Sequence, residues 1–283
     1  MTPSPALDRT YLVEHFERGQ VNRASSVTEE FAGKGVNVSK NLALAGFSAP
    51  AVVPLAPVDQ GACADDPLIV CSDISGRLRV NITAIEPDGT TTKINQAAPA
   101  LSSEEWGGLV ARTVDQAHAN QAEWVIVAGS FPQVDGGIPS PQSLHSALNG
   151  SARIALDTSG AVLTHWAQSG LVDFIKPNVR ELGEAVGRQL HTVGDVIDAA
   201  TEVSRWGVRY VMVSMGADGF LGCADGQAWW AQSEPVAARN TIGAGDASVS
   251  GFFASLMSAP EDIPQAVVLA ATWGAQKVQQ STS

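Results

Sequence analysis

The sequence predicts an α/β protein of three layers, in which helices cover both faces of a mainly parallel sheet. Short apolar runs alternate with helical patterns along the chain, which is the order of βαβ units. The runs are apolar throughout, as expected of parallel strands that are buried on both faces. Ligands bind beyond the carboxyl ends of the strands in such sheets, so we expect the functional residues there.

The predicted strands can be placed from their sequence. They are the runs Trp124–Ala128, Ile154–Leu156, Val172–Ile175 and Val208–Val213. Between the last two, Thr192 and Asp195 predict a capped helix start, and Gly207 predicts its end. The strand ends are followed by glycine or polar residues, namely Gly129, Asp157, Asn178, Ser214 and Gly216.

Two other segments, about 9–31 and 70–97, predict a small second β-sheet. A hairpin is indicated by the β-rich stretches 77–85 and 90–95 around the turn residues 87–89. Alternation places the polar residues of each strand on one face, Arg77, Arg79 and Asn81 in the first and Lys93 and Asn95 in the second. A basic face of this kind fits a lid over an anion, although a solvated hairpin face explains the same pattern.

Composition narrows the classes of function. The chain has 283 residues, with 17 basic against 29 acidic residues and a formal charge of −12. This acidity argues against binding to nucleic acid or to anionic membranes. The sequence predicts a cytoplasmic protein, because its three cysteines lack metal-ligand spacing and it shows neither a long apolar run nor a signal-peptide pattern. We treat residues 1–283 as one domain.

The segment 240–246, with the sequence NTIGAGD, is the strongest local signal. Gly243 and Gly245 allow a tight turn before a small-residue helix, whose free N–H groups suit a phosphate. Asp246 in the first turn could accept a proton from a hydroxyl nucleophile. A glycine-rich turn with Asp246 as a simple helix cap is the alternative.

Three weaker segments point the same way, each with a structural alternative. Residues 32–39 bring Lys34 and Asn37 to a helix start, where an ordinary loop–helix junction would look the same. Asn178 and Glu181 share a helix face and suit Mg²⁺ held through water, or form a plain capping box. The glycines in 214–219 suit backbone approach by a nucleotide, or a hairpin turn.

In this order, the four segments resemble those of the PfkB-type carbohydrate kinases, of the ribokinase-like superfamily, over nearly the whole chain. AGKGVNV and NTIGAGD are similar to the two signatures of that family, and KPNVRE and SMGADG to the segments between them. TPSPALD, GRLRVNI and TTTKIN are most similar to the 1-phosphofructokinase branch. The resemblance implies a ribokinase-like fold with a β-sheet lid, ATP and Mg²⁺ as cofactors, and a homodimer formed through the lid.

The resemblance also implies a role for each matching residue. Asp246 would be the catalytic base, beside an anion hole made by the N–H groups of Gly243, Ala244 and Gly245. The sugar phosphate would be bound by Asp8, Gly33, Lys34, Asn37, Arg79 and Lys93. Nucleotide and magnesium would be held by Asn178, Glu181 (through water to the metal), Ser214, Gly216 and Gly219.

The function implied by the resemblance is phosphoryl transfer from ATP to fructose 1-phosphate, which gives fructose 1,6-bisphosphate. A tagatose-6-phosphate or fructose-6-phosphate kinase with the same site is an alternative. Another is a degraded homologue that binds a sugar phosphate without turning it over. Retention of Asp246 and of both glycines of GAGD favours an active enzyme.

Overall fold

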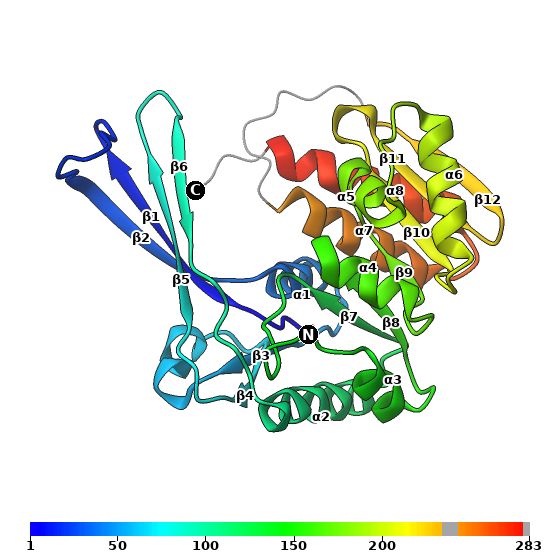
Figure 1. Cartoon of the computed structure of the whole chain (residues 1–283), viewed down its shortest axis with the longest axis horizontal. Coiled ribbons are helices and arrows are strands. Elements are labelled where there is room, and N and C mark those ends of the chain that lie inside the picture. Colours follow the sequence, from blue (N-terminus) through cyan, green and yellow to red (C-terminus); the bar gives the residue numbers. More distant parts are fainter. Residues whose placement is uncertain (234–242, 280–283) are drawn as a thin grey trace.

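A computed structural model describes residues 1–233 and 243–279 of the chain. Its α/β part holds most of the helices around a twisted sheet, and a smaller β-sheet extends from one side of it (Figure 1). The first three residues of the NTIGAGD segment, 240–242, lie outside the described residues.

The main sheet has six strands in the order β12-β11-β10-β9-β8-β7. Strands β7 to β10 are parallel, whereas β11 and β12 add antiparallel to the edge. Their bounds are Trp124–Ala128 (β7), Arg153–Asp157 (β8), Phe174–Ile175 (β9), Tyr210–Ser214 (β10), Phe220–Ala224 (β11) and Gln227–Ala231 (β12). The four predicted strands are therefore present, and the mainly parallel α/β fold is confirmed.

A short parallel ladder of β3 (Ala51–Leu55) and β4 (Ile69–Asp73) lies beyond β7. Met1 and Thr2 join this ladder to the main sheet. The Thr2 N–H donates to the Val52 carbonyl on one side, and the Ala128 N–H donates to the Met1 carbonyl on the other. The beginning of the described chain thus lies between the two ladders, next to the carboxyl end of β7.

Helices cover both faces of the sheet, as the predicted three-layer arrangement requires. One face packs against α2 (Ser103–Ala119), α3 (Gln142–Leu148), α4 (Gly160–Gln168), α5 (Val179–Val186) and α6 (Val193–Ser204). The other face packs against α1 (Lys34–Leu44), α7 (Ala244–Ser258) and α8 (Ile263–Gln279). Two short 3₁₀ turns are η1 (Pro57–Cys63) and η2 (Gly216–Asp218). None of the helices in the described part of the chain is long and apolar enough to cross a bilayer.

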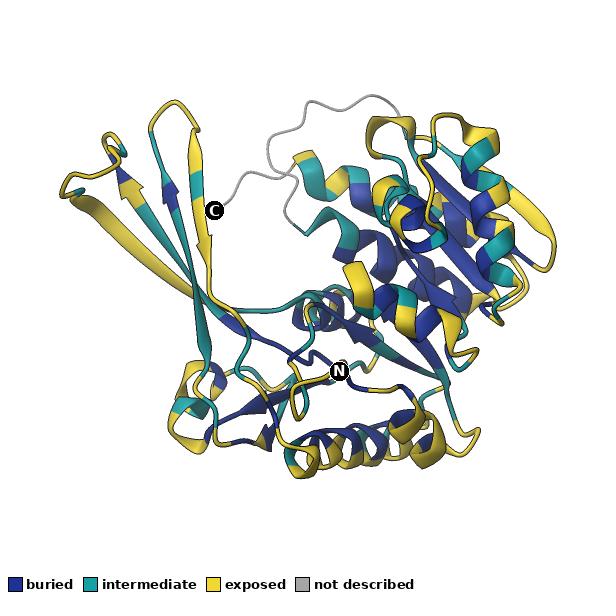
Figure 2. Ribbon diagram, viewed as in Figure 1, coloured by how far each residue is buried: buried dark blue, intermediate teal, exposed yellow. Residues whose placement is uncertain are grey.

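The smaller sheet, called the lid below, consists of β1 (Ala6–Val13), β2 (Ala24–Ala32), β5 (Arg79–Ile85) and β6 (Thr91–Asn95), in the order β2-β1-β5-β6. Strand register gives it two different faces. The polar face carries Asp8, Arg79, Asn81, Lys93 and Asn95, whereas the opposite, mostly apolar face carries Leu7, Tyr11, Val27, Val80, Ile82 and Ile94. Figure 2 shows that the lid is largely exposed or half-buried, in contrast to the buried main sheet.

Two features of this region differ from the sequence prediction. The range 70–97 includes most of β4, which pairs with β3 and not with the lid strands. The predicted position of Arg77 on the basic face is wrong. Arg77 precedes β5, and its Nη2 atom lies 2.8 Å from Oδ1 of Asp59 in η1. The Asp59 carboxylate also accepts the Leu78 N–H, so this contact fixes the entry to β5.

Candidate active site

Asp246 lies in the first turn of α7, and only 5% of its surface is exposed to solvent. Its Oδ2 atom accepts a hydrogen bond of 2.7 Å from Asn37 Nδ2, which belongs to the first turns of α1. The two helices pack against each other on the same face of the sheet. Two residues that are 209 positions apart in the sequence are therefore brought together at the helix starts.

The N-terminus of α7 is open to an anion. Gly243 is its N-cap and has φ 77°, a left-handed conformation that favours glycine. No side chain of the described residues caps this helix or α1, whereas α2, α5 and α6 each have a capping box. The N–H groups of the first turn, which include Ala244 and Gly245, are thus left without a helical acceptor and suit a phosphate.

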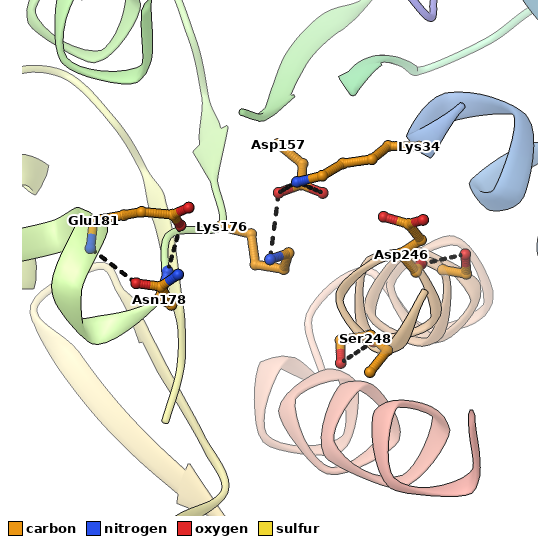
Figure 3. Close-up of polar contacts among 9 residues, drawn as sticks. Lys34, Asp157, Lys176, Asn178, Glu181, Asp246 and Ser248 are labelled. Atoms are coloured by element: carbon orange, nitrogen blue, oxygen red, sulfur yellow. Dashed lines mark hydrogen bonds and ion pairs between the residues drawn. The ribbon is translucent and has the colours of Figure 1, made fainter. Parts of the chain in front are cut away.

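The glycines around Lys34 have a packing reason. A Cβ atom at Gly33 would lie 2.6 Å from Thr2 Cγ2, and one at Gly35 would lie 2.3 Å from Thr2 Oγ1. Only glycine lets the start of α1 approach residues 1–5 this closely. The intervening Lys34 is consequently held at the helix start, where its side chain extends toward the end of β8 (Figure 3).

Two lysines converge on one buried carboxylate at the end of β8. Asp157 is 1% exposed, and Lys34 Nζ lies 3.5 Å from each of its carboxylate oxygens. Lys176, which follows β9 and is itself 5% exposed, places Nζ 3.3 Å from Asp157 Oδ1. A Cβ atom at Gly245 would lie 3.3 Å from Lys176 Nζ, so this ammonium group also reaches the start of α7.

These charges change the ionisation of the predicted base. Burial and, second to it, the nearby Asp157 carboxylate raise the pKa of Asp246 from 3.8 to about 6, against the Asn37 hydrogen bond and the two lysines, which lower it. Burial alone would lower the pKa of Lys34, but Asp157, Asp246 and Glu181 outweigh it and raise that pKa. The site therefore keeps Lys34 charged while it brings Asp246 close to the pKa of an effective general base.

The pH dependence of turnover should reflect this shift. Because only ionised Asp246 can accept a proton, kcat/KM should fall about tenfold per pH unit below a midpoint near pH 6. The rate should be measured from pH 5 to pH 8 at saturating Mg²⁺. A midpoint near pH 4, the ordinary value for aspartate, would contradict the burial argument.

The residues predicted to bind the sugar lie at the base of the lid. Asn81 Nδ2 donates to Asp8 Oδ1 at 2.9 Å across the paired strands β1 and β5. Two buried oxygen atoms beside them, Asn81 Oδ1 and Ser4 Oγ, have no hydrogen-bond partner among the described residues. Unpaired buried oxygens are costly, so hydroxyl groups of a sugar would be suitable partners for them.

Arg79 is partly committed to the backbone. Its Nη2 and Nε atoms donate to the carbonyls of Ser4 (2.9 Å) and Pro5 (3.1 Å), and Nη1 lies 3.4 Å from the Gln96 carbonyl. Burial lowers its pKa, against the opposing effect of Asp8. Three of its five N–H groups thus contact backbone carbonyls at the base of the lid, and its role as a phosphate ligand stays a prediction.

Lys93 lies farther along the polar face of the lid, in β6 opposite Thr83. It is exposed, and no ion pair links it to another part of the described chain. The structure therefore places Lys93 on the same face as Asp8 and Arg79 but does not bring it into contact with them. Its role as a phosphate ligand stays a prediction.

Asn178 and Glu181 form a reciprocal capping box at the start of α5. Asn178 Oδ1 accepts the Glu181 N–H and Glu181 Oε2 accepts the Asn178 N–H, both at 2.9 Å. The structural alternative is thus present, and it leaves the other carboxylate oxygen of Glu181 for water. No group of three or more His, Cys, Asp and Glu side chains that could hold a metal ion exists within residues 1–233 and 243–279.

The segment 214–219 lies beside this helix start. The Ser214 N–H donates to the Pro177 carbonyl at 3.0 Å, and Ser214 forms a bridge to Asn178. Gly216 and Gly219 both have positive φ, and a Cβ atom at Gly219 would lie 2.3 Å from the Ala231 carbonyl oxygen. The close approach of β12 therefore explains the glycine at 219 without a ligand.

Sequence reasoning gave no role to several residues of this site. Asp157 was noted only as a strand end, and Lys176 only as part of a motif. Ser4 was not assigned to the site, and Asn81 was noted only for its place on the polar face of the lid. The available signal was position, because Asp157 and Lys176 directly end or follow neighbouring parallel strands.

Comparisons with known proteins identify the family of the chain. The model of the pfkB family carbohydrate kinases matches residues 4–283. The chain is 34% identical to the 1-phosphofructokinase of Rhodobacter capsulatus, over 87% of this chain and 79% of that protein. It is 32% identical to the 1-phosphofructokinase of Haloferax volcanii, over 90% and 82% of the two chains.

Solved structures share the fold. Phosphofructokinase-2 from Escherichia coli in complex with potassium superposes with a TM-score of 0.86 at 24% identity, over 99% of this chain and 92% of that one. The same enzyme in complex with fructose-6-phosphate gives 0.85 at 23% identity, over 100% and 93%. With a family model that spans nearly the whole sequence and relatives above 30% identity, the chain belongs to the pfkB family of carbohydrate kinases.

Proposed function

We propose that the protein transfers the γ-phosphoryl group of ATP to fructose 1-phosphate and so forms fructose 1,6-bisphosphate. The observation that carries the proposal is the buried Asp246, held by Asn37 at an uncapped helix start that faces two lysines. This arrangement has a base, an anion site and positive charge in one place, which phosphoryl transfer requires. The names of the relatives support the choice of sugar phosphate.

The proposed step transfers one phosphoryl group and one proton. A lone pair of the sugar hydroxyl forms a bond to the γ-phosphorus, and the bond from that phosphorus to the bridging oxygen of ADP breaks. The hydroxyl proton passes to the Asp246 carboxylate. The N–H groups of Gly243, Ala244 and Gly245, with Lys34 and Lys176, would stabilise the negative charge on the phosphoryl oxygens.

The remaining assignments concern the two substrates. Asp8 and Asn81 would orient the sugar hydroxyls, and Arg79 with Lys93 would bind the phosphate that the sugar already carries. ATP would lie along 214–219 and the start of α5. Mg²⁺, when bound, would neutralise the nucleotide phosphates, with Glu181 as a ligand through water.

A comparison of sugar phosphates tests the proposal. ADP release should be measured with fructose 1-phosphate, fructose 6-phosphate and tagatose 6-phosphate at equal concentrations. We expect the highest kcat/KM with fructose 1-phosphate. The likeness to an enzyme solved with fructose-6-phosphate makes that sugar the main competitor. Negligible turnover of all three would indicate a degraded homologue that only binds its ligand.

We also propose that the apolar face of the lid is covered by a second copy of the chain. Val27 is 49% exposed and Ile94 is 59% exposed on this face, and the lid strands make their main contacts with one another. A sheet with one apolar face needs a partner in water. A tetrameric form of Escherichia coli phosphofructokinase-2 has been solved, so assembly occurs in a protein of this fold.

Oligomeric state provides the test of this interface. Sedimentation should show a dimer at micromolar concentration, and Ile94→Glu should shift it to the monomer because a charge would be buried between the lids. Val193→Glu is a matched control, since Val193 is also exposed but lies on α6. A monomeric wild-type protein, or a dimer unaffected by Ile94→Glu, would refute the lid interface.

A further inference from the structure

Asp157 lies at the centre of the candidate site but has no role in the proposed transfer step. Its side chain is buried at the carboxyl end of β8, and its backbone carbonyl accepts the Gly129 N–H at 2.9 Å. In Figure 3 its carboxylate lies between the ammonium groups of Lys34 and Lys176. These lysines come from elements that are far apart in the sequence, so Asp157 is the point at which they meet.

The contacts are of intermediate length. Distances of 3.3 and 3.5 Å exceed the 2.7–2.9 Å or so of a tight ammonium–carboxylate hydrogen bond. Each ammonium group has three N–H donors. Both lysines are therefore held near Asp157 by charge, and both keep donors for the oxygens of an incoming phosphoryl group.

A second carboxylate competes for the same cations. Asp246 is also buried, and the charges of Lys34 and Lys176 act on it as well. Lys176 Nζ already approaches the position of Gly245, next to Asp246 in the sequence. Without Asp157, Asp246 would be the buried carboxylate on which both lysines act, and an ion pair there would occupy the base.

We propose that Asp157 is a positioning residue, which holds Lys34 and Lys176 on the path of the transferred phosphoryl group and keeps them from pairing with Asp246. The inference rests on the phosphoryl-transfer role proposed for Asp246. It assigns Lys34 to the phosphoryl group that moves rather than to the phosphate already on the sugar. Asp157 itself neither gains nor loses a proton or a bond during the reaction.

The test is the variant Asp157→Asn, which keeps the shape of the side chain and removes its charge. We expect kcat to fall about 10- to 100-fold, as for the loss of organised charge around a phosphoryl group, with a smaller change in the KM for either substrate. The acid limb of kcat/KM should move to lower pH, because a like charge is removed and the lysines turn toward Asp246. Asp157→Glu should recover part of kcat.

The control is Asp225→Asn, the same change at an exposed aspartate that pairs with Arg209 at the far edge of the sheet. It should leave kcat and the acid limb unchanged. A purely structural role for Asp157 would lower the melting temperature without moving the acid limb, and that result would overturn the proposal. So would a wild-type kcat.

A metal-ligand role gives a different signature. If Asp157 bound Mg²⁺, Asp157→Asn would raise the Mg²⁺ concentration needed for half-maximal rate, and Asp157 would not be a positioning residue. Turnover by the wild-type protein tests the kinase assignment separately. Loss of the positioning role therefore cannot be mistaken for failure of the proposed function.

Discussion

Replacing Asp246 by asparagine should reduce kcat at least about 100-fold, because asparagine cannot accept the hydroxyl proton. The variant should still bind ATP, since the N–H groups of Gly243 to Gly245 and both lysines are unchanged. Steady-state rates and calorimetric ATP titration would measure the two effects. Turnover within a few-fold of the wild type would remove Asp246 from the role of base.

The same substitution should stabilise the unliganded protein. The pKa of Asp246 is about 6 in the folded state against 3.8 in the unfolded state, so its contribution to stability is complete below pH 3.8 and is lost as the pH rises through 6. At pH 7.5 the buried charge therefore opposes folding by on the order of 1–3 kcal/mol. Asparagine removes this charge and can still accept the Asn37 hydrogen bond.

The melting temperature at pH 7.5 should consequently rise by about 2–4 °C for each kcal/mol gained. The exposed Asp225→Asn is again the matched control, and it should lower stability slightly or not at all because its surface pair with Arg209 is worth little. An Asp246→Asn protein that melts below the wild type at pH 7.5 would contradict the burial argument. Lost activity with increased stability is the expected combination.

The second large effect is expected at the lid. Lys93→Ala should raise the KM for the sugar phosphate about 10- to 100-fold, because a hydrogen bond between charged groups contributes roughly 1.5–3 kcal/mol. The KM for ATP and kcat should change by less than about twofold. Initial rates with each substrate varied in turn would separate the two constants.

Lys40→Ala is the matched control for this variant. Lys40 is a half-exposed lysine of α1, and its ammonium group lies 3.7 Å from Glu30, which belongs to the lid strand β2, and 4.0 Å from Asp66. It should leave both KM values unchanged. Equal increases in the two KM values for Lys93→Ala would place Lys93 outside the sugar-phosphate pocket.

The parts of the fold that local sequence determines were predictable. Strand β7 has the predicted bounds Trp124–Ala128 because an apolar run between polar residues has few alternatives in a buried sheet. The helix after Thr192 has the expected capping box. The side-chain direction of Arg77 was not predictable, because it depends on Asp59 in a 3₁₀ turn that no periodic pattern reveals.

The site was predictable where motifs carry it and not where folding assembles it. Glycine and aspartate in GAGD indicate a helix start with a carboxylate, whatever the rest of the chain does. Asp157 and Lys34 are 123 positions apart, so no spacing pattern in the sequence could predict their contact. The unpaired oxygens of Ser4 and Asn81 are likewise buried only in the folded chain, so the local sequence does not reveal them.

The uncapped starts of α1 and α7 have a practical consequence. A side-chain cap contributes about 0.5–2 kcal/mol to a helix, and these two helices do without it. An anion that binds there in the folded state alone would replace the missing stabilisation in proportion to the logarithm of its concentration. The buffer thus becomes a variable in any melting experiment, and phosphate or sulfate salts should protect this enzyme more than chloride at equal ionic strength.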